Sequence, residues 1–267
     1  MSYKFNENLF ERDIEPVFST GFNDIDELLK LTTKGSIITI GARPSMGKTS
    51  FAISILNHLL EQKKKVFYFS LQYSKTIFER RLIANKAQAD YIKLSRFQKY
   101  LKPAMEFYED KELTVDYTAN ITVEEIEKKV KENVPDIVFI DYIQLVKMPK
   151  APNFSDSINL AVQEIKRIAD ETGCIFVILT QLSRALECRC DKRPMLSDIR
   201  NCGLLEEISN VIMMIYRDEY YNKENTENRG KAEISIIRND FGHSSTIILL
   251  FQPNICCFKN PLKVVSF

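Results

Sequence analysis

The segment Gly41–Thr49 has the residue types and spacing of a phosphate-binding loop, Gly-Ala-Arg-Pro-Ser-Met-Gly-Lys-Thr. In such a loop, backbone N–H groups wrap the phosphates, and the N-terminal end of the next helix favours their negative charge. We expect Lys48 to reach the terminal phosphates of a nucleotide and the Thr49 hydroxyl to ligate Mg²⁺. The strict pattern has glycine at the position of Ala42, which is a mild departure. The expected nucleotide-binding residues are Ala42, Arg43, Pro44, Ser45, Met46, Gly47, Lys48, Thr49 and Ser50.

The segments on either side of this loop predict the strand and the helix that it needs. Residues 36–40 form a β-branched run that is typical of a strand. Residues 50–60 place apolar side chains on one face of a helix, namely Phe51, Ala52, Ile55, Leu56, Leu59 and Leu60. A chance loop without a ligand is the alternative, and the strand–loop–helix order argues against it. The sequence therefore predicts a nucleotide-binding protein.

Two further polar residues end predicted strands. Asp141 closes the apolar run 137–140, an arrangement that places a carboxylate at the sheet edge beside Lys48 and Thr49. We expect Asp141 to hold Mg²⁺ or one of its waters. Gln181 ends the next strand, and its amide is a candidate sensor of the terminal phosphate. The structural alternative for Asp141 is an ordinary aspartate at the solvent boundary, and the alternative for Gln181 is a plain polar strand end. For Gln181, spacing alone does not decide between a sensor and a plain strand end.

The composition limits the classes of protein to consider. The chain has 267 residues, of which 45% are hydrophobic and 27% charged, as in an ordinary soluble globular protein. A formal net charge of +1 excludes a generally basic nucleic-acid coat and allows a local DNA-binding patch. With no run of 18 apolar residues and no secretory leader, we expect a cytoplasmic protein without a membrane partner. The six cysteines lack paired Cys-x-x-Cys spacing, so we expect reduced thiols and no zinc site.

The order of the predicted elements gives the fold class. Continuous apolar strands that alternate with helices predict an α/β fold with a mostly parallel central sheet flanked by helices. These strand runs lie at 36–40, 65–70, 136–141, 174–180 and 211–216. Helices are expected at 122–133, opened by a capping box, and at 158–173, ended by Gly173. Three later runs predict antiparallel strands added near the C-terminus, at 232–237, 246–250 and 256–258. We expect one domain over 18–267, preceded by a linker or interface arm at 1–17.

Several segments between residues 18 and 260 resemble, in the same order, the motor domain of the DnaB-type bacterial replicative helicase. They are Thr20–Phe22, Asp24–Asp26, Ala42–Thr49, Asp141–Leu145, Gln181–Glu187, Asp191–Pro194, Ser197–Arg200, Ile215–Glu219 and Ala232–Ile234. The resemblance implies a RecA-like P-loop NTPase fold, a ring that is usually hexameric, ATP bound between subunits and single-stranded DNA drawn through the centre. Family members usually carry an N-terminal domain that contacts primase, and only about 17 residues precede the motor here, so we do not expect that domain. A RecA-like ATPase of the recombination or clock type is disfavoured by the segments at 191–194 and 215–219.

The resemblance also implies where DNA binds. Arg200 and Gly203 match positions of a pore loop that grips the DNA backbone, and a guanidinium with exposed N–H groups suits sequence-independent phosphate contact. Arg184, Lys192 and Arg193 lie in the same segment and can add positive potential. A solvated loop is an equally good reading of any one of these charges.

Two departures from the family pattern concern catalysis. Gln72 stands where the family usually has a glutamate that polarises the attacking water, and Asp240 stands where it has an arginine finger for the neighbouring subunit's ATP. Arg238, at the family's lysine position, shares a strand face with Asp240 and can substitute in part. The catalytic candidates are thus Lys48, Gln72, Asp141, Gln181 and Arg238.

Two functions remain open at this point. One is an ATP- and Mg²⁺-dependent helicase motor that acts in DNA replication. The other is a paralogue that binds ATP without hydrolysing it and serves as a loader, an inhibitor or a structural ring subunit, alone or in a mixed ring with a replicative helicase. Partners implied by the resemblance are single-stranded DNA, further copies of the chain and a helicase loader.

Overall fold

The computed structural model describes residues 17–96, 98–199, 202–224 and 226–261. The predicted arm at 1–17 lies outside these residues except for Val17. The strands are β1 (Ile37–Ala42), β2 (Val66–Ser70), β3 (Leu113–Asp116), β4 (Ile137–Asp141), β5 (Ile175–Gln181), β6 (Val211–Tyr216), β7 (Lys231–Asn239), β8 (Ser245–Gln252) and β9 (Cys257–Lys259). The helices are α1 (Asn23–Leu29), α2 (Lys48–Glu61), α3 (Lys75–Ala87), α4 (Gln98–Glu109), α5 (Val123–Asn133), α6 (Phe154–Thr172), α7 (Gly203–Ile208) and α8 (Asp218–Tyr221).

The strands form a single sheet in the order β3-β2-β4-β5-β1-β6-β7-β8-β9. The pairs from β3 to β6 are parallel, whereas β7, β8 and β9 pair antiparallel at one edge. The α/β class, the mostly parallel sheet and the antiparallel C-terminal strands are confirmed. The central strands β1, β2, β4 and β6 are buried at every position, as expected for a sheet covered on both faces.

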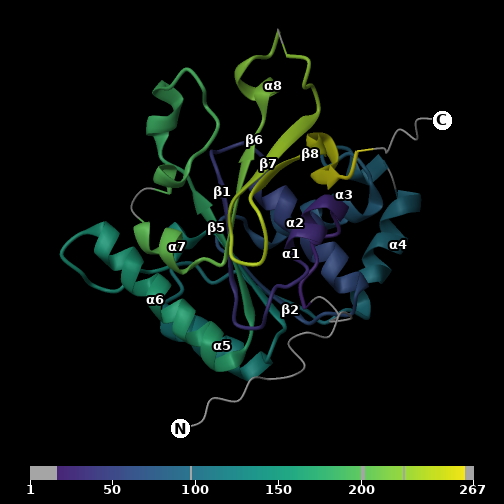
Figure 1. The fold of residues 1–267 in the computed structure, drawn as a ribbon. Helices are drawn as coiled ribbons and strands as arrows, with labels where there is room; N and C mark the ends of the chain where they lie inside the picture. The colour runs from purple at the N-terminus through teal and green to yellow at the C-terminus, as the bar shows by residue number, and fades with distance from the viewer. Residues whose placement is uncertain (1–16, 97, 200–201, 225, 262–267) are drawn as a thin grey trace.

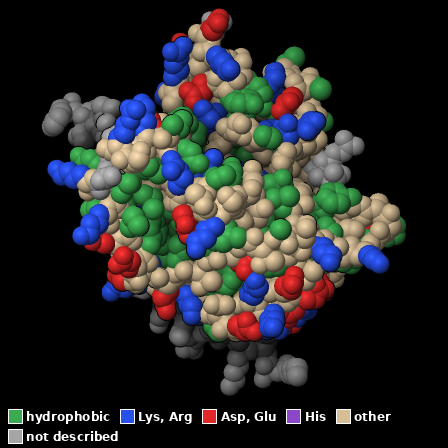
Figure 2. All heavy atoms as spheres, turned by 180° about the vertical axis from the view of Figure 1, so that it is seen from behind, with side chains coloured by type: hydrophobic (Ala, Val, Ile, Leu, Met, Phe, Trp, Pro, Cys, Tyr) green, Lys and Arg blue, Asp and Glu red, His purple; other side chains and the backbone are tan. Residues whose placement is uncertain are grey.

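Helices cover the two faces of the sheet (Figure 1). Helices α1, α2 and α3 contribute side chains to one core cluster, which includes Ile25, Phe51 and Phe78. Helices α5, α6 and α7 contribute to the other, which includes Ile126 and Ile165. On the face seen in Figure 2, basic and acidic side chains are interspersed, in keeping with the small net charge.

Local signals in the sequence are reflected in the helix ends. Thr122 and Glu125 make the reciprocal bonds of a capping box at the start of α5. Gly173 adopts the left-handed conformation directly after α6. The strand β3 and the helices α3, α4, α7 and α8 were not predicted. No helix of the described residues is long and apolar enough to cross a membrane. All six cysteines are free, and no cluster of three or more His, Cys, Asp or Glu side chains suited to a metal occurs in the described chain.

Candidate nucleotide-binding site

The candidate residues gather at the carboxyl edge of the sheet. The loop 43–47 joins β1 to α2, Asp141 is the last residue of β4, and Gln181 is the last residue of β5. Strand β5 lies between β4 and β1, so three neighbouring strand ends carry these groups. Gln72 follows β2, which pairs with β4 on its other side. Ligands of open α/β sheets bind in the crevice outside the carboxyl ends of the strands.

The loop has a backbone that only certain residues adopt. Gly47 has φ +98°, a conformation that L side chains rarely adopt, and Ser45 has φ +66°. A Cβ atom on Gly47 would lie 3.0 Å from the rings of Phe251 and Phe258. Glycine at this position therefore satisfies both the turn and the close approach of β8 and β9. Helix α2 starts at the next residue, so its unpaired N–H groups face the crevice.

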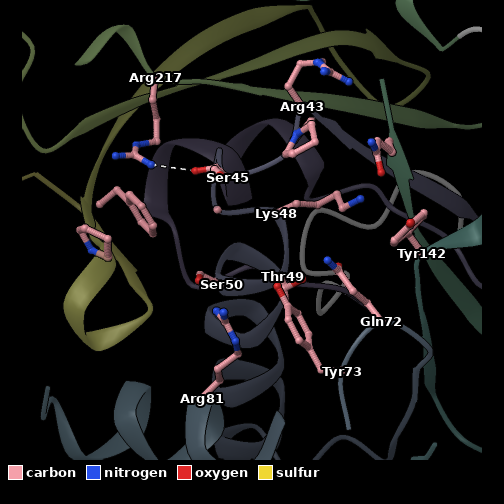
Figure 3. Close-up of a pocket in the computed structure, with 16 residues that line it drawn as sticks. Arg43, Ser45, Lys48, Thr49, Ser50, Gln72, Tyr73, Arg81, Tyr142 and Arg217 are labelled. Carbon is pink, nitrogen blue, oxygen red and sulfur yellow. Dashed lines mark hydrogen bonds between the residues drawn. The ribbon is translucent and has the colours of Figure 1, made fainter. Parts of the chain in front are cut away.

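A cavity of about 370 Å³ opens above the start of α2 (Figure 3). The lining residues that were predicted are Ala42, Arg43, Pro44, Ser45, Gly47, Lys48, Thr49, Ser50, Gln72 and Gln181. Lining residues that were not assigned to the site are Tyr73, Arg81, Tyr142, Phe251 and Pro253, together with Arg217, for which the sequence offered no spacing argument. Met46 is the exception among the loop residues, because its side chain is buried in the core.

Asp141 and Thr49 are in direct contact behind the cavity. The Thr49 hydroxyl donates to Asp141 Oδ2 at 2.8 Å, and the Tyr68 hydroxyl donates to the same oxygen at 2.9 Å. The carboxylate is completely buried, and its Oδ1 has no hydrogen-bond partner in the described chain. Burial raises the pKa of Asp141, although Lys48 and the two hydroxyl donors oppose the shift. A carboxylate with a free oxygen beside a threonine hydroxyl is a donor set suited to Mg²⁺.

Lys48 extends along the cavity toward Tyr142 (Figure 3). Its ammonium lies 4.4 Å from the centre of the Tyr142 ring, a cation–π contact. Burial lowers the pKa of Lys48 to about 8, and the attraction of Asp141 only partly offsets this effect. Near neutral pH, the charged Lys48 therefore lies at a place where Asp141 supplies only part of the counter-charge that it needs. An anion in the cavity would supply the rest.

Arg43 connects the loop to the segment after β5. Its guanidinium pairs with Glu187 at 2.8 Å and donates to the Leu182 carbonyl at 2.9 Å. The side chain is buried, so this pair is shielded from water on the Arg43 side. Arg43 thus shapes one wall of the cavity while its charge is already paired with Glu187.

The opposite wall is made by the C-terminal strands. Arg217 follows β6, and its guanidinium lies 4.5 Å from the centre of the Phe251 ring and donates to the Ser45 carbonyl at 3.0 Å. Pro253 follows β8 and lines the same end of the cavity. A flat cation stacked on an aromatic ring, next to a proline, makes a wall on which a planar base can pack.

Unpartnered polar atoms concentrate at this cavity. In the described chain, buried side-chain nitrogen or oxygen atoms without a hydrogen bond occur on Arg81, Asp141, Arg217 and Tyr221. Arg81 and Arg217 line the cavity, and Asp141 is bonded to Thr49, which lines it too. Buried polar groups without partners are rare in proteins and call for an explanation such as a ligand or an ion. In the described chain, one nitrogen of Arg81, one nitrogen of Arg217 and one oxygen of Asp141 therefore lack a partner where the loop N–H groups converge, and the charge of Arg217 is already paired with Glu219.

Comparison with known proteins identifies the family. The family model of the DnaB-like helicase C terminal domain matches residues 18–260. This chain belongs to that family. It is 34% identical over 263 residues to a probable replicative DNA helicase of Trieres chinensis, a match that covers 90% of this chain and 56% of the relative. It is also 34% identical over 260 residues to the replicative DNA helicase DnaB of Haemophilus influenzae, with 91% of this chain and 55% of the relative covered. The chain thus spans little more than half the length of these curated relatives.

Solved structures show the same architecture. The chain superposes with a TM-score of 0.87 and 30% identity on a solved ATPase domain, covering 92% of this chain and 93% of that one. A DnaB-like replicative helicase, described with its interactions with primase, gives a TM-score of 0.86 and 31% identity over 91% of this chain and 61% of that one. The RecA-like fold of a DnaB-type ATPase domain, expected from the sequence, is confirmed.

Within this DnaB-like domain, the two departures from the family pattern lie in different places. Gln72 is exposed at the cavity. Arg238 and Asp240 are not at the cavity of their own chain. The Arg238 guanidinium donates to the Glu207 carbonyl at 2.8 Å and to Asp240 at 3.2 Å. Asp240 also accepts a bond from the Asn210 amide at 3.2 Å. Arg238 is therefore held by the end of α7 and by the carboxylate two residues away.

The DNA-binding candidates of this DnaB-like domain differ in their surroundings. Arg184 is exposed and lines a groove next to the cavity, together with Arg43, Tyr142 and Gln181. Lys192 lies over the Tyr221 ring at 5.5 Å. The Arg193 guanidinium pairs with Glu233 at 2.7 Å, so most of its charge is already neutralised. Gly203 is exposed at the first residue of α7, and Arg200 lies outside the described residues.

Proposed function

We propose that this chain binds ATP with Mg²⁺ in the cavity and serves as the single-stranded-DNA-binding motor domain of a DnaB-type helicase in replication. The observation that carries the proposal is the concentration of unpartnered buried polar atoms where the loop and the strand ends meet. A triphosphate offers acceptors for the Arg81 guanidinium, and a divalent cation offers a partner for the free carboxylate oxygen. The similar solved structure that is described as an ATPase domain covers nearly the whole chain and agrees with this chemistry.

Each part of the nucleotide has a place in the proposal. The loop N–H groups and Lys48 hold the phosphates, and Thr49 and Asp141 hold the metal. Bound Mg²⁺ would neutralise charge on the phosphates as the terminal one is transferred. The base packs on the wall formed by Arg217, Phe251 and Pro253. The nucleotide then extends from this wall, which carries its base, toward Gln72 at its terminal phosphate.

DNA binding is proposed for the segment that follows β5. The exposed Arg184 and the half-buried Lys192 carry charge, and Gly203 presents the N–H groups at the start of α7. Arg200 is included among the proposed DNA-binding residues on the family resemblance alone. Arg193 contributes less, because Glu233 already pairs with it. A ring of several copies, a helicase loader as partner, and a cytoplasmic location are proposals that follow from the family.

A second candidate function is a member of the family that binds ATP and does not hydrolyse it. It is favoured by Gln72, whose amide cannot act as a base, and by Asp240 at the position of the finger. Loss of a general base lowers a rate by about 10²–10⁴-fold, and loss of an arginine finger by about 10³–10⁵-fold. The two factors do not multiply, because both groups act on one transition state. Such a chain would load, inhibit or complete a ring whose other subunits supply the missing groups.

One experiment tests the proposal and separates the two candidates. Binding of Mg-ATP to the purified chain is measured by titration, with Lys48→Met as the control that removes the phosphate-binding cation. ATP hydrolysis is then measured with and without single-stranded DNA, for the wild type and for a Gln72→Glu, Asp240→Arg double variant. Turnover by the wild type at about 1 per second or faster, stimulated by DNA, supports the motor. Activity that appears only in the double variant supports the non-hydrolysing candidate, and failure to bind Mg-ATP contradicts both.

A further inference from the structure

Tyr68 places a hydroxyl group in the core of the protein, next to the candidate metal-binding carboxylate. It lies in the middle of β2, between Phe67 and Phe69, and its side chain is completely buried. The centre of its ring lies 5.3 Å from that of Phe139 and 4.6 Å from that of Phe78. A phenylalanine would make the same ring contacts, so packing alone does not account for the hydroxyl. Its burial costs free energy unless the hydroxyl forms a hydrogen bond.

The register of the sheet determines which partner this hydroxyl meets. Strand β2 pairs with β4 in parallel, with Tyr68 opposite Phe139 and Ser70 opposite Asp141. Asp141 lies two residues after Phe139, so its side chain points to the same face of the sheet as the Tyr68 ring. The Tyr68 hydroxyl donates to Asp141 Oδ2 at 2.9 Å, and this is its only hydrogen bond among the residues that the structure describes. The hydroxyl of Tyr68 is therefore committed to Asp141.

Two donors share one oxygen of Asp141 and leave the other oxygen free. The Thr49 hydroxyl, at the start of α2, donates to Oδ2 at 2.8 Å, whereas Oδ1 has no partner in the described chain. A carboxylate oxygen has two acceptor sites, so Thr49 and Tyr68 together fill those of Oδ2. These two bonds fix the orientation of the carboxylate, and Oδ1 is the oxygen that remains available to a cation or to one of its waters.

We propose that Tyr68 is a positioning residue for the metal: its hydroxyl holds Asp141 in the orientation that binds the Mg²⁺ of a bound nucleotide, directly or through water. The inference rests on the proposed function and adds to it a residue that does not line the cavity. Groups that hydrogen-bond a metal ligand orient that ligand, and replacing them typically lowers metal affinity about 10- to 100-fold. Tyr68 therefore affects nucleotide binding through the metal and not through the phosphates.

Tyr68→Phe tests the inference, because it keeps the ring and removes only the hydroxyl. The matched control is Tyr108→Phe, which removes a hydroxyl that donates to Asn57 at 2.7 Å and to the Leu82 carbonyl at 3.1 Å, outside the cavity lining. Dissociation constants of a non-hydrolysable ATP analogue are measured by calorimetric titration, once with Mg²⁺ and once in EDTA. The ratio of the two constants is the gain in affinity that the metal provides. Urea unfolding without nucleotide shows whether each variant is folded.

The same substitution in an Asp141→Asn background tests whether the effect depends on the carboxylate. Asparagine at this position has no negative charge to offer a cation, and the buried charge that the Tyr68 hydroxyl stabilises is gone. The fold of this background therefore depends less on the hydroxyl. The comparison of Asp141→Asn with Asp141→Asn, Tyr68→Phe gives a result even where Tyr68→Phe alone does not fold.

The positioning role predicts one pattern. Tyr68→Phe lowers the gain in affinity from Mg²⁺ by about 10- to 100-fold and leaves the affinity in EDTA within about twofold of the wild type. Tyr108→Phe leaves both quantities within about twofold, as expected for a separate site. In the Asp141→Asn background, Tyr68→Phe changes the gain from Mg²⁺ by less than about twofold, because the two residues act as a unit.

Other patterns would overturn the inference. Equal losses of affinity with Mg²⁺ and in EDTA would make Tyr68 a packing residue only. A gain from Mg²⁺ that Tyr68→Phe leaves unchanged would show that the metal does not need the hydroxyl. A loss that persists in the Asp141→Asn background would mean that Tyr68 acts through another group. In each of these cases the wild type still binds the nucleotide with Mg²⁺, so the proposed function stands. A wild type that binds the nucleotide under neither condition overturns the proposed function and this inference together.

Discussion

The effect of Lys48 on the free energy of unfolding should depend on pH in its size and on bound nucleotide in its sign. Burial at the start of α2 lowers its pKa from the ordinary value of 10.5 to about 8. The unfolded chain therefore keeps the Lys48 proton between about pH 8 and pH 10.5, while the folded chain has lost it. Stability rises with pH wherever the unfolded state binds more protons, so the charged Lys48 lowers stability below about pH 8. Replacing it by methionine should therefore stabilise the nucleotide-free protein near neutral pH.

The size of this effect follows from the pKa difference. A fall from 10.5 to about 8 corresponds to an upper limit of about 3 kcal/mol. Two effects reduce it: Lys48 is partly open to solvent in the cavity, and its removal takes a favourable charge away from Asp141. We expect Lys48→Met to raise the free energy of unfolding by about 1–3 kcal/mol at about pH 7. The gain should shrink from about pH 8 upward and vanish near pH 10.5.

Urea unfolding of the nucleotide-free protein at several pH values measures this difference. Lys128→Met is the matched control, because Lys128 lies on α5 with 74% of its side chain exposed. It should change stability by less than about 0.5 kcal/mol at every pH. Saturating Mg-ATP should reverse the order of stability, since only the wild type gains binding free energy from the phosphates. A Lys48→Met protein that is less stable than the wild type without nucleotide at about pH 7 would refute the reasoning.

Three further substitutions test other parts of the structure. Gly47→Ala should lower stability by about 1–2 kcal/mol and abolish tight Mg-ATP binding, because of its positive φ and the Phe258 ring 3.0 Å from a new Cβ; calorimetric titration and urea unfolding check this. Thr122→Ala removes the α5 cap and should lower the free energy of unfolding by about 1 kcal/mol in urea, without changing nucleotide affinity. Arg193→Met should change stability by less than about 1 kcal/mol and weaken single-stranded DNA binding only slightly in a fluorescence titration, because Glu233 already pairs with this exposed arginine.

The parts of the site that are contiguous in sequence could be predicted. A phosphate-binding loop is a local device: nine consecutive residues supply the N–H groups, the lysine and the hydroxyl, and the strand and helix beside them are strongly patterned. The position of Asp141 could be predicted for the same reason, because a fully apolar strand that ends on an aspartate places its carboxylate at the carboxyl edge of the sheet. The parallel sheet followed from runs that are buried on both faces.

The walls of the cavity could not be predicted in the same way. Phe251 and Pro253 reach the loop only because β7, β8 and β9 fold back as antiparallel strands and place their apolar side chains against Gly47. Tyr73 and Arg81 lie on the segment after β2, and nothing in the spacing of Arg81 distinguishes a half-buried cation at the cavity from a solvated one. Tertiary contacts across the sheet decide these positions, and a single sequence records them weakly.

The missed elements have individual physical reasons. Strand β3 has four residues, all half-buried at the edge of the sheet, so it lacks the apolar run that marks the inner strands. Helix α4 contains Pro103, a residue that sequence reasoning treats as a helix breaker. The ion pair of Arg193 could not be predicted, because its partner Glu233 lies 40 residues away on β7.

The contacts around the loop link the nucleotide cavity to the proposed DNA-binding segment. Arg43, in the loop, is bonded to Glu187 and to the Leu182 carbonyl just after β5. The Gln144 amide, after β4, donates to the Thr180 hydroxyl at 2.8 Å and accepts from the Gln181 N–H at 3.2 Å. The end of β5 is thus tied to the phosphate-binding loop on one side and to the strand that carries Asp141 on the other. Because Arg184 lies three residues after β5, these hydrogen bonds connect both the loop and the Asp141 strand to the segment that carries the exposed charges.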